Sequence, residues 1–137
     1  MTRNKLLALA GIAAAAALIG AQPPSVLAQA TPGIWEVTGA PGVKAPVRQC
    51  VSDVTALARF EHRAQHCSAK VTRDDGSSMV VDYSCGSAGF GRSQVQLITP
   101  RSLRIETQGI SQQLPFNYVL QVRRIGDCQM QAAAQHH

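Results

Sequence analysis

Four cysteines and four histidines are the side chains of this 137-residue chain best suited to metal, redox or acid–base chemistry. The cysteines are separated by 16, 17 and 42 residues, so no pair has the close Cys-x-x-Cys spacing of a zinc site or a reactive dithiol. An even number of cysteines in an exported chain is typical of structural disulfides. We therefore expect two disulfides among Cys50, Cys67, Cys85 and Cys128.

The segment between Cys67 and Cys85 indicates how the cysteines pair. Its centre, residues 74–78, is made of turn-forming residues, and its flanks alternate as half-buried strands do. A hairpin folded about Gly76 sets four pairs opposite each other: Cys67–Cys85, Ala69–Tyr83, Val71–Val81 and Arg73–Met79. This register predicts the disulfide Cys67–Cys85 and leaves Cys50 to pair with Cys128.

His62 and His66 are four residues apart at the end of the only helical pattern, a spacing at which two imidazoles can share a metal with His136 and His137. Imidazole also suits a solvated helix end, and no carboxylate pair completes a ligand set. We therefore predict a solvated helix end and no metal. The sequence has no Gly-x-Ser-x-Gly motif, and its pattern places no two carboxylates in one cleft. We predict no catalytic residues, no cofactor and a protein that is not an enzyme.

The N-terminus has the features of a secretion signal. Arg3 and Lys5 precede an apolar run over residues 6–21, and small residues follow it. The run is shorter than the ~20 residues that span a bilayer, which argues against a permanent anchor. We predict that residues 1–30 are a cleaved signal peptide, with a cut after Ala30 preferred to one after Ala28.

Residues 31–128 are predicted to form one small domain, and residues 129–137 a flexible C-terminal tail. Without the leader's Arg3 and Lys5, the chain has 11 Lys and Arg against 8 Asp and Glu, a net charge of +3. The basic residues are scattered along the sequence instead of clustering with aromatic residues. This pattern argues against a nucleic-acid partner.

The fold is predicted to be mainly β, an antiparallel meander of about six strands with one short helix. Connections of about five residues suit hairpins and are too short for parallel crossovers. The helix is expected from Ser52 or Asp53 to about Ala64. The glycine-rich residues 86–91 are expected to be a turn or bend. The later hairpins give four predicted pairs: Val95–Ile105, Leu97–Leu103, Ile105–Phe116 and Leu103–Tyr118. The twisted sheet either curls into a partial barrel or lays one face on the helix.

Trp35, Phe116 and Tyr118 are the candidate ligand-lining residues. Trp35 is the only tryptophan, and Phe116 and Tyr118 lie on the apolar face of the strongest strand pattern, residues 114–122. A small antiparallel barrel can hold one small ligand against such residues. They can equally belong to the core, which is the interpretation we favour for Trp35.

Several segments together point to a family. They are Gly33-Ile34-Trp35-Glu36-Val37-Thr38 after the leader, Gln49-Cys50-Val51, the spaced Cys67 and Cys85, and Arg124-Ile125-Gly126-Asp127-Cys128. Over residues 31–128 the chain resembles the small exported proteobacterial proteins grouped as domain of unknown function family 3617. The resemblance implies an envelope-targeted, disulfide-bonded, mainly β domain of a Gram-negative bacterium. It implies no activity and no site residues. Because no twin-arginine pair precedes the apolar run of the leader, we expect export to the periplasm through the general secretion route.

Two functions from different classes remain open. The first, which we favour, is a non-enzymatic interaction or structural protein of the envelope, with another envelope protein as its partner. The alternative is a periplasmic module that binds a small apolar or amphipathic ligand in the curled sheet. Neither needs a nucleic acid or a stable membrane span after the leader is removed. A cavity lined by inward strand residues would favour the ligand, and a solid core the interaction.

Overall fold

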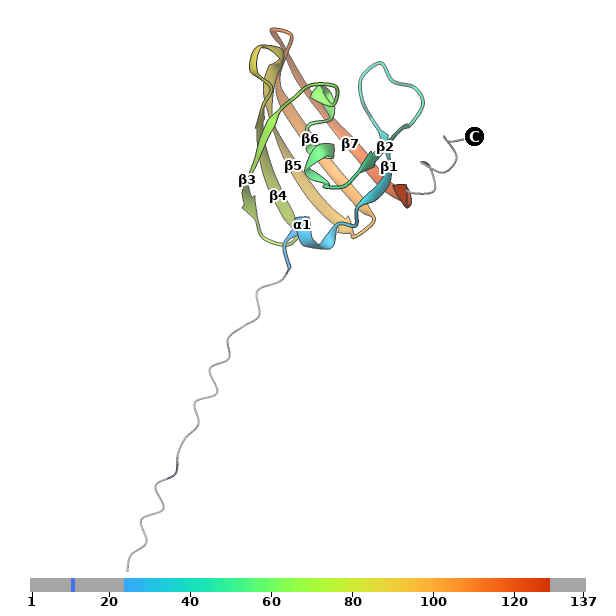
Figure 1. The fold of residues 1–137 in the computed structure, drawn as a ribbon, viewed down its shortest axis with the longest axis vertical. Coiled ribbons are helices and arrows are strands. Elements are labelled where there is room, and N and C mark those ends of the chain that lie inside the picture. The colour runs from blue at the N-terminus through green and yellow to red at the C-terminus, as the bar shows by residue number, and fades with distance from the viewer. Residues whose placement is uncertain (1–10, 12–23, 129–137) are drawn as a thin grey trace, which may run out of the picture.

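The computed structural model describes Gly11 and residues 24–128, and a curled seven-stranded antiparallel sheet is its main element (Figure 1). The strand order is β2-β1-β7-β6-β5-β4-β3, so the first and last strands of the chain are neighbours, while β2 and β3 form the two edges. The strands are β1 (Gly33–Thr38), β2 (Val47–Val51), β3 (Ser68–Asp74), β4 (Ser78–Ser84), β5 (Gly89–Thr99), β6 (Ser102–Ser111) and β7 (Leu114–Gly126).

Short helices cover the concave side of this sheet (Figure 1). α2 (Thr55–Ala58) and η1 (Phe60–His62) follow β2 and lie inside the curl, α1 (Val26–Gln29) lies at its lower end, and η2 (Gly86–Ala88) precedes β5. Within residues 24–128, no helix is long and apolar enough to cross a membrane. The two arrangements that the sequence left open are therefore combined, because the sheet curls and also carries helices on one face.

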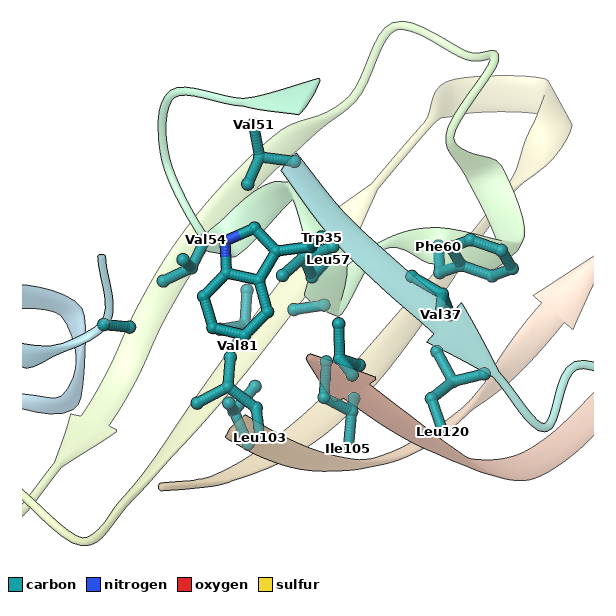
Figure 2. Packing of buried hydrophobic residues seen from close by; sticks show 14 of the residues in the cluster. Trp35, Val37, Val51, Val54, Leu57, Phe60, Val81, Leu103, Ile105 and Leu120 are labelled. Atoms are coloured by element: carbon teal, nitrogen blue, oxygen red, sulfur yellow. The ribbon is translucent and has the colours of Figure 1, made fainter. Parts of the chain in front are cut away.

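The inner face of the sheet and the helices form one hydrophobic core (Figure 2). Trp35 on β1 is completely buried, and its indole Nε1 donates a hydrogen bond to the carbonyl of Thr31 at 3.0 Å. Leu57 and Phe60, from α2 and η1, are also buried and pack into the same cluster. Burial of such side chains contributes about 1.5–3 kcal/mol each. The concave side is thus filled by side chains.

The two predicted disulfides are confirmed. Cys67 is bonded to Cys85, with Cα atoms 4.1 Å apart, and Cys50 is bonded to Cys128, with Cα atoms 5.5 Å apart. The first joins the ends of the β3–β4 hairpin, and the second ties β2 to the residue just beyond β7. Each bond therefore fixes one edge strand of the open sheet.

The strand prediction holds in outline, with one strand more than expected. The short extended segment around Cys50 pairs with β1 and becomes β2, which raises the count to seven. In the β3–β4 hairpin, Val71 lies opposite Val81 as predicted, but a bulge then places Arg73 opposite Val80 instead of Met79. The predicted pairs Val95–Ile105 and Leu97–Leu103 of the next hairpin are confirmed.

The register predicted between β6 and β7 is wrong. Residues 108–111 continue strand β6, and the turn contains only Gln112 and Gln113, both with positive φ. A two-residue hairpin turn with two positive φ values matches the twist of its strands. Ile105 therefore lies opposite Leu120, not Phe116, and Leu103 lies opposite Val122. The shift is an even number of residues, so the predicted inward face is retained.

The predicted helix over residues 53–64 is shorter and broken. α2 spans only Thr55–Ala58, and η1 follows as a 3₁₀ turn. The helix also starts later than predicted: its N-cap is Val54 instead of Ser52 or Asp53, although the Asp53 carboxylate accepts a hydrogen bond from the Thr55 amide at 2.8 Å. His62 was predicted to be solvated, but only 2% of its surface is exposed, because the 3₁₀ turn directs it into the curl of the sheet.

Candidate functional site

Two glycines lie side by side in the middle of the sheet and shape the surface around them. Gly91 on β5 pairs with Gly109 on β6, and their neighbours in the same cross-strand row are Tyr83 on β4 and Phe116 on β7. An added Cβ on Gly91 would lie 2.5 Å from Cζ of Tyr83. One on Gly109 would lie 2.1 Å from the Phe90 carbonyl oxygen and 3.0 Å from Cε1 of Phe116. The aromatic rings thus occupy the space that other residues at these positions would fill.

A hollow of about 660 Å³, which we call the trough, crosses the outer face of the sheet over these glycines. Alternation along the strands places two rows of outward side chains on either side of the glycine row. One row is apolar and consists of Phe90, Ile110 and Pro115. Phe90 is 55% exposed.

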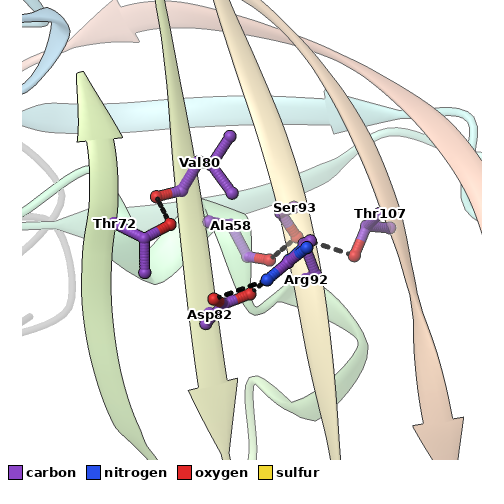
Figure 3. A network of polar contacts seen from close by, with 7 residues as sticks. All are labelled: Ala58, Thr72, Val80, Asp82, Arg92, Ser93 and Thr107. Atoms are coloured by element: carbon purple, nitrogen blue, oxygen red, sulfur yellow. Dashed lines mark hydrogen bonds and ion pairs between the residues drawn. The ribbon is translucent and has the colours of Figure 1, made fainter.

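The other side of the trough is polar. It is formed by the row Asp82, Arg92, Gln108 and Asn117. Arg92 and Asp82 form a two-point ion pair across β4 and β5, with Nε–Oδ1 and Nη2–Oδ2 distances of 2.6 and 3.0 Å (Figure 3). The hydrogen bond from Arg92 lowers the pKa of Asp82, and the same bond raises the pKa of Arg92. Both groups therefore stay charged at neutral pH.

A second hollow of about 500 Å³, the aromatic groove, opens beside the covering helices. It is lined by residues of the loop after β1, of η1 and its end, and of the first half of β7: Ala40, Pro41, Val43, Phe60, Glu61, Arg63, Pro115, Phe116, Asn117 and Tyr118. The Tyr118 hydroxyl donates a hydrogen bond to Glu61 Oε2 at 2.6 Å, and the Arg63 guanidinium lies 4.1 Å from the centre of the Phe60 ring. The groove thus combines an aromatic wall with one acidic and one basic side chain.

The buried polar groups beneath these hollows are paired with one another. His62 Nε2 lies 3.1 Å from the carbonyl oxygen of Ala88, which can only accept, so Nε2 carries the proton and Nδ1 accepts from the Tyr83 hydroxyl at 3.1 Å. Burial is the main cause that raises the pKa of Tyr83 to about 12. Burial also raises the pKa of Tyr118, and the adjacent Glu61 adds to this effect.

Ser93 and Thr107 form a second buried polar contact, deeper in the sheet. Ser93 Oγ donates to the carbonyl of Ala58 in α2, and the hydroxyl oxygens of Ser93 and Thr107 lie 2.8 Å apart (Figure 3). Both residues are buried on the inner face, between the row of Tyr83 and the aliphatic core. This contact attaches the covering helix to the centre of the sheet.

The structure separates the three predicted ligand-lining residues. Phe116 and Tyr118 line the aromatic groove, and their ring centres are 5.8 Å apart. Phe116 also borders the trough. Trp35 lines neither hollow and is fully enclosed in the core, as we favoured for it. Among the described residues, no group of three or more His, Cys, Asp or Glu side chains is arranged to hold a metal.

Comparison with protein families gives one result that covers most of the domain. The family model described as "Protein of unknown function (DUF3617)" matches residues 30–128. The chain belongs to the DUF3617 family. The matched range includes all seven strands and both disulfides, so the membership describes the whole sheet. Neither the curated proteins nor the solved structures give a match.

In this DUF3617 protein, the trough was not predicted from the sequence. Residues 86–91 were predicted to be a turn or bend, yet strand β5 starts at Gly89 and includes Phe90 and Gly91. The sequence feature that could have predicted it is Phe90 between Gly89 and Gly91. An aromatic residue flanked by glycines in a strand has no bulky neighbours along that strand. Leu114 was assigned to the inward face, but it lies at the exposed end of that face.

Proposed function

We propose that this protein is a non-enzymatic interaction protein of the bacterial envelope, exported to the periplasm, and that another envelope protein binds it at the trough. The observation that carries the proposal is the contrast between a filled interior and an exposed apolar surface. Trp35 is wholly buried, whereas Phe90 is 55% exposed on the outer face, in one cross-strand row with Ile110 and Pro115. Large exposed apolar side chains that lie close together commonly mark protein-binding sites.

The composition of the trough supports a protein partner. Protein interfaces commonly have an apolar centre with a border of polar residues, and aromatic and arginine side chains are frequent in them. Here the apolar row of Phe90, Ile110 and Pro115 faces Arg92 and Asn117 across the glycine floor. An apolar side chain of the partner would fill the hollow, and the amides and the ion pair would bond its backbone.

The edges of the sheet are less suited to a partner. Edge strands are protected from pairing by charged residues and bulges. β3 carries Lys70 and Arg73 and contains the bulge next to Val71. β2 is only five residues long and is tied down by the Cys50–Cys128 bond. These features favour binding on the face of the sheet.

The proposal of a non-enzyme is supported by the side chains that could act in catalysis, because they form structural bonds. Both nitrogens of His62 are engaged in structural hydrogen bonds, and the Ser93 hydroxyl is bonded to Ala58 in the core. All four cysteines are in disulfides. The Tyr118–Glu61 bond likewise connects β7 to η1. In this arrangement the polar groups hold the helices on the sheet.

Quantitative co-purification from envelope extract tests the proposal. Phe90→Ser and Ile110→Ser, both in the apolar row of the trough, should each reduce recovery of the same partner at least fivefold. Ile98→Ser is the matched control, because Ile98 is 54% exposed on the same strand as Phe90 but near its other end. Equal recovery with all three variants would exclude the trough as the binding site.

The aromatic groove supports a second candidate, a module for a small amphipathic ligand. Its volume of about 500 Å³ lies in the range of small-molecule sites, and it presents Phe116 and Tyr118 beside Arg63. The native mass of the periplasmic protein distinguishes the two functions. One reproducible small-molecule adduct that is lost in a Phe116→Ala variant would favour the ligand, and a clean protein mass would favour the interaction.

A further inference from the structure

The segment just before β1 is built into the domain, and this feature is independent of the trough. The amides of Val26 and Leu27 donate hydrogen bonds to the two carboxylate oxygens of Asp74, at 2.7 and 3.2 Å. Ser25 Oγ accepts from the Ala28 amide at 3.0 Å and starts the turn α1. The side chain of Gln29 donates to the carbonyl of Gly76 at 2.8 Å. The β3–β4 turn therefore holds α1 through three separate hydrogen bonds.

The same segment supplies residues to the core. Val26 is completely buried and Ala30 is 3% exposed, and both belong to the cluster that contains Trp35. The next residue, Thr31, donates its amide to the carbonyl of Pro100 at 3.1 Å and accepts from the Trp35 indole. Residues 25–31 thus reach from the β3–β4 turn to the β5–β6 turn and close the lower end of the curled sheet (Figure 1).

We propose that the exported, mature protein keeps Ser25–Ala30 as a structural clamp, and that the leader is removed upstream of Ser25. A cut after Ala28 or Ala30, which the small residues there suggest, would remove Val26 from the core and leave Asp74 without two of its donors. Further upstream, Gly20 and Ala21 end the apolar run and offer another small-residue position for the peptidase.

The mass of the protein exported from its full-length gene gives the first test. After denaturation and reduction, the mass should correspond to a chain that begins between residues 22 and 25. A mature chain that begins at Gln29 or Thr31 would overturn the proposal, because Val26 would then be absent from the working protein.

Two neighbouring residues provide the second test. Val26 is buried and Leu27, next to it in the same turn, is 38% exposed. In protein purified from the periplasm, Val26→Ala should lower the melting temperature by roughly 5–10 °C, because it leaves a cavity in the core. Leu27→Ala should change it by less than about 2 °C. Equal melting temperatures for the two variants would also overturn the proposal.

Discussion

The ring of Tyr83 lies directly over Gly91 on the neighbouring strand, so close that an added Cβ would be 2.5 Å from both Cζ and the hydroxyl oxygen. This placement brings the Tyr83 hydroxyl within hydrogen-bonding distance of His62 Nδ1. The pairing of Gly91 with Gly109 also leaves backbone as the floor of the trough, between its two rows of side chains. One small residue therefore supports both the buried polar network and the surface at which we place the partner.

An alanine at Gly91 should therefore destabilise the domain. The added methyl group must displace the Tyr83 ring, and overpacking of this kind costs about 1–3 kcal/mol in the free energy of unfolding. Gly109→Ala should cost more, because its Cβ would meet backbone, the carbonyl oxygen of Phe90, at 2.1 Å. Gly126→Ala is the control, since nothing lies within 4 Å of its added Cβ. Urea unfolding measures all three, and a Gly91 variant as stable as the Gly126 variant would contradict the packing described.

The long-range disulfide should contribute more stability than the hairpin disulfide. Cys50 and Cys128 are 78 residues apart and Cys67 and Cys85 only 18, so their removal frees loops of very different length. From chain entropy, removing Cys50–Cys128 should lower the free energy of unfolding by about 4.5 kcal/mol, and removing Cys67–Cys85 by about 3 kcal/mol. The double variants Cys50→Ser/Cys128→Ser and Cys67→Ser/Cys85→Ser avoid unpaired thiols. Thermal unfolding of both should show the lower melting temperature for the first, and the reverse order would contradict this account.

The two tyrosines should resist ionisation in the folded protein. The pKa of Tyr83 is raised to about 12 and that of Tyr118 is raised further, mainly by burial. A tyrosine whose pKa is higher in the folded than in the unfolded state contributes to stability. The contribution is complete below the unfolded tyrosine pKa of about 10 and is lost as the pH rises through the folded pKa. The free energy of unfolding should thus fall above pH ~10.

Ultraviolet absorbance of tyrosinate measures this directly. Ionisation should coincide with loss of the native circular dichroism signal, and a Tyr118→Phe variant should lose less stability at alkaline pH than the wild type. A tyrosine that ionises near its ordinary pKa while the sheet stays folded would show that one of the two rings is not enclosed.

The hairpins that the sequence predicts correctly are those whose ends are marked by turn residues or cysteines. The Cys67–Cys85 register follows from the turn around Gly76, and Leu97–Leu103 follows from the turn around Pro100. The β6–β7 register could not be read in this way, because its turn consists of Gln112 and Gln113, which rarely adopt positive φ. Local sequence patterns thus predict turns only where residues of the usual turn types occur.

The candidate site was harder to predict, because it depends on pairing between distant strands. Phe116 and Tyr118 were correctly identified as neighbours on one strand, but Glu61, which accepts the hydrogen bond of Tyr118, comes from η1, 57 residues away in the chain. His62 was expected in solvent, since nothing in the local pattern shows that Gly89 and Tyr83 leave room for its ring. The trough likewise exists only because Gly91 and Gly109 meet across two strands.

Site-specific photocrosslinking in living cells tests the central claim most directly. A photoreactive phenylalanine analogue at position 90 preserves the aromatic residue, and the same analogue at position 98 controls for exposure on the same strand. We expect a discrete crosslinked species with one envelope protein from position 90, diminished by Ile110→Ser, and none from position 98. No crosslink from position 90, or the same crosslink from both positions, would contradict a protein-binding site at the trough.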